Sequence, residues 1–171
     1  MPSIALNALC ILILNPSHDK AWTNKGYVLE CLSRHHDALA CYNRALEINP
    51  HHEDAWYNKG AALEALGRYK ESYDCADQAT TLFPNSYKAW YHKGAALGFM
   101  RRFSEAIACY DRALMLNTND AKTWFNKGSA LGNSGRIREA LTCYEQAQKL
   151  GAPHAAQMVA LCRRQLGHGI I

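Results

Sequence analysis

The fold is decided by the stretch AWTNKGYVLECLSRHHDALACYNRALEINP at residues 21–50, because similar stretches begin at residues 55, 89 and 123. These stretches start 34 residues apart, so residues 19–154 divide into four units of equal length. All four tryptophans of the chain occupy the same position of their units: Trp22, Trp56, Trp90 and Trp124. A period of 34 residues indicates a repeat protein, in which each unit is one supersecondary element stacked on its neighbours.

Each unit contains two segments with helical periodicity. In the first, glycine follows tryptophan by four residues and leucine follows glycine by three, as at Trp22, Gly26 and Leu29. The second segment repeats this spacing with small and aromatic residues: Ala38, Tyr42 and Ala45 in the first unit. Intervals of four and three residues put side chains on one face of an α-helix. Each unit is therefore predicted to be an antiparallel pair, a first helix (helix A) and a second helix (helix B).

The residues outside the four units are predicted to be helical as well. Pro16 lies 34 residues before Pro50, so the segment before it corresponds to helix B of an incomplete leading unit. Ala155, Val159 and Cys162 share one helical face near the end of the chain and predict a closing helix. The predicted organisation is a half repeat at 1–18, repeats at 19–52, 53–86, 87–120 and 121–154, and a capping helix and tail at 155–171.

Composition excludes several classes of protein. Apolar residues make up 49% of the chain and charged residues 20%, as in globular proteins and unlike disordered or collagen-like ones. The net charge of +4 is too small to indicate a nucleic-acid-binding protein by itself. No apolar run approaches the roughly 18–20 residues of a membrane helix. We therefore expect no membrane association.

The cysteines predict neither disulfides nor a metal site. Four of the seven recur at one position of helix B: Cys41, Cys75, Cys109 and Cys143. Equivalent positions of stacked helices lie about 10 Å apart, beyond the roughly 7 Å limit between the Cα atoms of a disulfide. The sequence contains no C-x-x-C pair and no Cys–His spacing typical of zinc. These residues are predicted to pack in the interior of a cytoplasmic protein.

Catalytic and cofactor-binding motifs are also missing from the sequence. It contains no P-loop, no nucleophile elbow and no G-x-G-x-x-G. Glycine pairs such as Gly94 and Gly98 lie within amphipathic helices, where they indicate close packing. We therefore predict that the chain is not an enzyme and uses no cofactor.

The order Trp, Gly, Leu, then Ala, Tyr, Ala and a closing proline resembles the tetratricopeptide repeat family over residues 19–154. The departures are Ala76 in place of the aromatic, Thr118 in place of the proline, and a lysine before each glycine: Lys25, Lys59, Lys93 and Lys127. The resemblance implies an all-α fold, a right-handed superhelical solenoid of antiparallel helix hairpins. It also implies a concave groove, lined by helices A, that holds peptides.

A second face of helix A, about 140° from the Trp–Gly–Leu stripe at 100° per residue, carries the candidate binding residues. Its asparagines can both donate to and accept from an extended peptide backbone. Its aromatic side chains offer apolar contact, and its lysines can contact an acidic residue or a terminal carboxylate. The candidate peptide-binding residues are Asn24, Tyr27, Tyr57, Asn58, Lys88, Tyr91, His92, Lys122, Phe125 and Asn126.

Some members of the family clamp the terminal carboxylate of heat-shock chaperones with lysine, asparagine and arginine side chains. The corresponding residues here are Thr23, Tyr27, Asn58, Lys88 and His92. Only Asn58 and Lys88 match that pattern, so a cochaperone role is disfavoured. A protein or peptide partner of other identity is expected.

Two alternative functions remain open from the sequence. The leading helix lacks its hairpin partner, so its apolar residues predict a homo-oligomer formed through the N-terminal edge: Leu6, Leu9, Leu12 and Ile13. Helical repeats can also read RNA. The 34-residue period and the acidic residues Glu30, Asp54 and Glu64 on the groove side count against a nucleic-acid partner.

Overall fold

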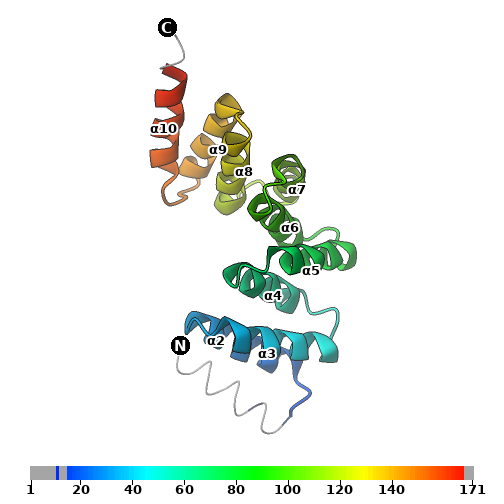
Figure 1. The fold of residues 1–171 in the computed structure, drawn as a ribbon. Coiled ribbons are helices and arrows are strands. Elements are labelled where there is room, and N and C mark those ends of the chain that lie inside the picture. The colour runs from blue at the N-terminus through cyan, green and yellow to red at the C-terminus, as the bar shows by residue number, and fades with distance from the viewer. Residues whose placement is uncertain (1–10, 12–14, 168–171) are drawn as a thin grey trace. The chain divides into compact units, whose positions relative to one another are not determined.

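The computed structural model describes residue 11 and residues 15–167, which form the helices labelled α2 to α10 in Figure 1 and no strand. The chain divides into two compact units, Met1–Pro84 and Asn85–Ile171, which we call unit 1 and unit 2. The antiparallel helix hairpins predicted from the sequence are confirmed in both units. The residues expected to mediate self-association lie outside the described residues: Leu6, Leu9, Leu12 and Ile13.

Unit 1 contains two complete hairpins. The first joins α2 (Asp19–Cys31) to α3 (His35–Ile48), and the second joins α4 (Glu53–Ala65) to α5 (Tyr69–Leu82). Helices α2 and α4 are helices A, and α3 and α5 are helices B. Their core consists mainly of alanine, leucine and cysteine side chains with one fully buried tyrosine, Tyr42.

Unit 2 also contains two hairpins, followed by one further helix. Helix α6 (Tyr87–Phe99) pairs with α7 (Phe103–Leu116), and α8 (Ala121–Asn133) pairs with α9 (Ile137–Lys149). Helices α6 and α8 are helices A, and α7 and α9 are helices B. The last helix, α10 (Ala155–Gly167), packs against α9.

The face of α10 that meets α9 carries the residues predicted for a closing helix. Ala155, Val159 and Cys162 are buried. An ion pair of 2.8 Å between Arg163 and Glu145 joins the outer surfaces of the two helices. Helix α10 therefore shields the apolar side of the last hairpin from water.

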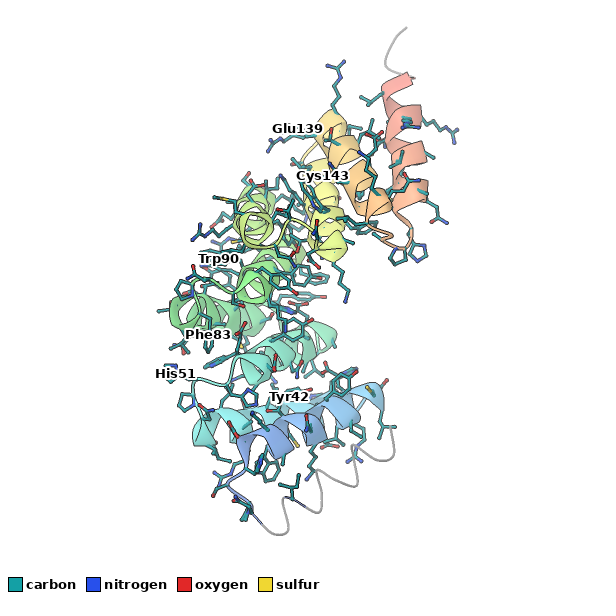
Figure 2. All side chains as sticks on the ribbon, turned by 180° about the vertical axis from the view of Figure 1, so that it is seen from behind. Tyr42, His51, Phe83, Trp90, Glu139 and Cys143 are labelled. Carbon is teal, nitrogen blue, oxygen red and sulfur yellow. The ribbon has the colours of Figure 1, made fainter. Side chains whose placement is uncertain are left out.

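Close packing within three of the four hairpins depends on a glycine of helix A that faces a tyrosine of helix B, since α5 has Ala76 at the tyrosine position. A Cβ atom on Gly26 would lie 2.5 Å from Cε1 of Tyr42, which Figure 2 labels on α3. A Cβ atom on Gly94 would lie 2.7 Å from Cε1 of Tyr110. Glycine is therefore needed because the tyrosine ring occupies the space that a side chain would fill.

The turn from helix A to helix B has one backbone conformation in all four repeats. A residue with positive φ ends helix A: Ser33 (58°), Gly67 (71°), Arg101 (60°) and Gly135 (80°). The next residue is an arginine, and it pairs with a carboxylate three residues later in the first turn of helix B, as Arg68 does with Glu71. The left-handed residue reverses the chain, and these exposed ion pairs contribute little to stability.

The four tryptophans are only partly buried. Each is half-buried, and its lysine neighbour covers the ring, with 4.9 Å between Nζ of Lys25 and the centroid of Trp22. The indole N–H of Trp56 donates to the carbonyl of Pro50 at 2.8 Å. Because the ammonium group lies over the ring, it takes part in a cation–π contact.

Candidate functional site

In unit 1 the candidate residues lie on α2 and α4 and differ in exposure. Asn24 and Tyr27 of α2 are exposed, with 47% of Tyr27 accessible to solvent. Tyr57 and Asn58 of α4 are half-buried. All four side chains are therefore wholly or partly accessible to a ligand.

Two carboxylates of helices A, those of Glu30 and Glu64, lie on the groove side of unit 1. Each accepts a hydrogen bond from a hydroxyl group of helix B. The hydroxyl of Tyr42 donates to Oε2 of Glu30 at 2.9 Å, and that of Ser72 donates to Oε1 of Glu64 at 3.3 Å. Burial, and then the bond to Glu30, raise the pKa of Tyr42 well above its usual range. Unit 1 therefore holds a carboxylate in a fixed position on each of its helices A, α2 and α4.

In unit 2 two of the predicted residues meet each other. Nδ2 of Asn126 on α8 donates to the hydroxyl of Tyr91 on α6 at 3.0 Å. The Tyr91 ring lies 6.2 Å from that of Tyr110, and Phe125 lies 5.3 Å from Tyr144. The aromatic residues of this face are thus anchored on helix B, which fixes their position before a ligand arrives.

His92 is the exception among the ten candidates. Only 5% of it is exposed, and its ring lies edge-on to that of Tyr91 at 5.1 Å. The sequence position two residues after tryptophan suggested a groove residue, as at Asn58. Because His92 is buried against the edge of Tyr91, it is much less accessible to a ligand than Asn58 at the equivalent position. Lys88 is half-buried and Lys122 is exposed.

A pocket of about 220 Å³ opens on the candidate face of unit 2. Residues from both helices A and from α7 line it: Ala95, Gly98, Phe99, Phe103, Tyr110, Asn126, Ser129, Ala130 and Asn133. Of the predicted binding residues, only Asn126 belongs to this set. Gly98 and Phe99 were missed, although one signal was available: the position eight residues after tryptophan is glutamate in unit 1 and glycine in unit 2.

A larger depression of about 540 Å³ lies in unit 1 between α3, α4 and α5. Trp56 and Leu63 contribute apolar surface, while Lys59, Asp74 and Asp77 contribute charges of both signs. None of the predicted binding residues lines it. Charges of both signs give this depression no clear preference for one class of ligand.

The cysteine side chains have the properties of packing residues. Cys41, Cys75, Cys109 and Cys143 are buried, and burial raises the pKa of Cys75 to about 11. A thiol with a raised pKa is a poor nucleophile and a poor metal ligand at neutral pH. Among residues 15–167, no group of three or more His, Cys, Asp or Glu side chains is arranged to hold a metal ion.

No helix among the described residues is long and apolar enough to cross a membrane.

Several solved structures share the fold. The crystal structure of YrrB, described as a TPR protein with an unusual peptide-binding site, is 23% identical with a TM-score of 0.71. The match covers 94% of this chain and 84% of YrrB. MamA protein is 20% identical with a TM-score of 0.73, over 87% of this chain and 82% of that one. No curated protein matches the sequence.

Family models agree with the repeat boundaries seen in the structure. Tetratricopeptide repeat models match residues 19–52, 53–86, 87–120 and 121–150. These matches cover most of the chain and include all eight helices of the four hairpins. The chain therefore belongs to the tetratricopeptide repeat family.

Proposed function

We propose that the chain is a protein-interaction scaffold that binds an extended segment of a partner protein across the exposed face of its helices A. Membership of the tetratricopeptide repeat family supports a non-enzymatic scaffold, and YrrB provides a related fold described with a peptide-binding site. The observation that carries the proposal is the pocket of unit 2 beside the Tyr91–Asn126 hydrogen bond.

The polar groups of this face suit a peptide backbone. Because Nδ2 of Asn126 donates to Tyr91, the amide oxygen of Asn126 is oriented and can accept a hydrogen bond from a peptide N–H. Asn133 and Ser129 line the same pocket and offer further donors and acceptors. The rings of Tyr91 and Phe125 are held by Tyr110 and Tyr144, so little side-chain freedom is lost on binding.

The test is selection of ligands from a random heptapeptide display library on the immobilised full chain. Affinities of the selected peptides are then measured by fluorescence anisotropy. Asn126→Ala is expected to weaken binding about tenfold, because it removes a half-buried hydrogen-bonding group worth roughly 1.4 kcal/mol. Asn58→Ala reports on unit 1 in the same way.

The matched control is Asn119→Ala, because Asn119 is exposed in the turn before α8 and lies away from the pocket. It should leave the affinity unchanged. Selection of no peptide above an unrelated helical protein would contradict the proposal. Equal affinities for the Asn58→Ala, Asn126→Ala and Asn119→Ala variants would also place the binding site elsewhere.

Self-association is a second candidate function, since the sequence predicts an apolar leading helix with Leu6, Leu9, Leu12 and Ile13. Light scattering over a range of protein concentrations tests it. A chain that stays monomeric at high micromolar concentration would contradict it.

A further inference from the structure

The two units differ at the position eight residues after each tryptophan. Unit 1 has Glu30 and Glu64 there, whereas unit 2 has Gly98 and Gly132. In unit 1 the Glu30 carboxylate accepts the hydrogen bond of Tyr42. Tyr110 is the equivalent tyrosine in unit 2, and the residue opposite it has no side chain. Gly98 thus leaves open the space that a glutamate fills in unit 1.

The geometry around Gly98 shows that this glycine is not required by packing. A Cβ atom there would lie 3.7 Å from the hydroxyl of Tyr110, an ordinary van der Waals distance. At Gly94, one turn earlier, the same atom would lie 2.7 Å from the Tyr110 ring. The structure therefore has unfilled space beside Gly98, and this space is part of the pocket of unit 2.

The walls of this pocket are mainly apolar and carry no charge. Phe99, Phe103 and Tyr110 contribute aromatic surface, while Ala95 and Ala130 contribute small aliphatic surface. Asn126, Ser129 and Asn133 are polar but neutral, and none of the described residues that line the pocket is charged. A charged side chain would lose hydration here without a counter-charge, whereas an apolar one would gain from burial.

The size of the pocket limits what can enter it. Small-molecule sites usually measure about 300–1,000 Å³, and this pocket measures about 220 Å³. Phe99, at its edge, is 54% exposed and is thus uncovered apolar surface beside the opening. The pocket is therefore sized for one side chain of a longer ligand, with Phe99 extending the apolar contact.

Positive charge lies close to the pocket on the same helix. Lys122 is exposed and precedes Asn126 by four residues, a rise of about 6 Å along α8. Two residues of an extended peptide span about 6.6 Å. A carboxylate two positions from a side chain seated in the pocket would consequently reach the ammonium group of Lys122.

We propose that unit 2 recognises an extended partner segment through one uncharged apolar side chain, seated in the pocket that Gly98 opens, and through a carboxylate two residues away that contacts Lys122. This inference rests on the proposed function and specifies its ligand. The class of ligand is a peptide with leucine, isoleucine, methionine or phenylalanine spaced two positions from aspartate or glutamate.

The experiment compares peptide selections on three full-length proteins: the unchanged chain, Gly98→Glu and Gly132→Glu. Both variants place glutamate at the same position of helix A, but Gly132 does not line the pocket. The unchanged chain and Gly132→Glu are expected to enrich the apolar and acidic pair. Gly98→Glu should lose the apolar preference and bind a synthetic selected peptide at least tenfold more weakly.

Misfolding would not account for a loss of binding by Gly98→Glu. The fold accommodates glutamate at this position in Glu30, opposite Tyr42, and glutamate favours helix more than glycine does. Circular dichroism and the melting temperature should therefore be unchanged or improved. A charge reversal tests the contact with Lys122. The Lys122→Glu variant should bind the selected peptide more weakly, and it should regain affinity for a peptide in which lysine replaces the acidic residue.

The possible results separate the two proposals. Enrichment of peptides without the apolar residue, or equal affinity of Gly98→Glu and the unchanged chain, would overturn this inference and leave the proposed function standing. No recovery with the lysine-bearing peptides would overturn the contact with Lys122. Selection of no peptide on any of the three proteins would overturn both proposals.

Discussion

The candidate faces of the two units have the same helical framework and opposite charge. In unit 1, Asp54, Glu30 and Glu64 outnumber the single lysine, Lys20, whereas unit 2 has lysines at 88 and 122 and no acidic residue at the corresponding positions. Gly98, which stands where unit 1 has glutamate, also lines an open pocket. A conserved packing scheme in the repeats therefore leaves a few surface positions free to set ligand chemistry.

The largest effect that tests this comparison is expected from two glycines of α6. Gly94→Ala should lower the free energy of unfolding by about 1–3 kcal/mol, because the added Cβ would lie 2.7 Å from Tyr110 and 3.2 Å from the Ala106 carbonyl. Gly98→Ala should raise it by about 0.5–1 kcal/mol, because the site has room and alanine favours helix. Urea denaturation measures both values.

A loss of stability in Gly98→Ala as large as that in Gly94→Ala would contradict the interpretation of Gly98. It would show that both glycines serve packing. The difference between the acidic and the open face would then have no bearing on ligand binding at this position.

A second test compares the pKa values of two buried tyrosines of helices B, Tyr42 in unit 1 and Tyr144 in unit 2. Burial and then Glu30 raise the pKa of Tyr42, while burial raises that of Tyr144 and its bond to Ser129 opposes the rise. A raised pKa stabilises the fold fully below the ordinary value of 10.0, and this stabilisation is lost as the pH rises above it. Tyr42 should therefore resist ionisation to higher pH than Tyr144.

The measurement is the free energy of unfolding between about pH 10 and pH 11, over which a tyrosine that stays protonated in the fold costs about 1 kcal/mol. Tyr42→Phe should flatten this slope by that amount, and Glu30→Gln serves as the control for the charge. If Tyr42→Phe and the unchanged chain lose stability equally, the Tyr42 hydroxyl does not ionise on unfolding in this range, and the assigned role of burial is wrong.

The fold could be predicted almost completely from the sequence. Tryptophan, glycine and leucine at intervals of four and three recur four times, so the sequence predicts every one of the four hairpins. Trp22 and its equivalents share a helical face with the buried glycine of each repeat, yet they are only half-buried. Periodicity assigns a residue to a face, but it does not reveal that Lys25 covers the indole or that the indole N–H bonds to a carbonyl six residues earlier.

The candidate site was predicted less well. The face was assigned from helical angles, yet His92 is buried there and only Asn126 lines the pocket. Whether a side chain on that face is open depends on the size of its neighbours on the next helix. Gly98 has no side chain to donate, accept or carry charge, so residue chemistry does not identify it as a binding residue, although its lack of a side chain opens the pocket. The signal in the sequence is the change from glutamate in the first two repeats to glycine in the last two.

The smallest expected effect concerns the opposite side of helix A. In unit 2, Asp111 of α7 forms a 2.6 Å ion pair with Lys127 of α8, and the equivalent residues of unit 1 are Asn43 and Lys59. The two lysines lie over their tryptophans at nearly equal distances, 5.5 and 5.4 Å, so only the acidic partner differs. Asp111→Asn therefore gives unit 2 the arrangement of unit 1.

This substitution should lower the free energy of unfolding by less than about 1 kcal/mol, because half of the Asp111 side chain is exposed. The loss should vanish in about 1 M salt, where screening acts over roughly 3 Å. Asn43→Asp should give unit 1 a salt-sensitive gain of similar size. A gain or loss that persists in high salt would mean that shape, and not charge, distinguishes the two units on this side, because screening weakens only the ionic contribution.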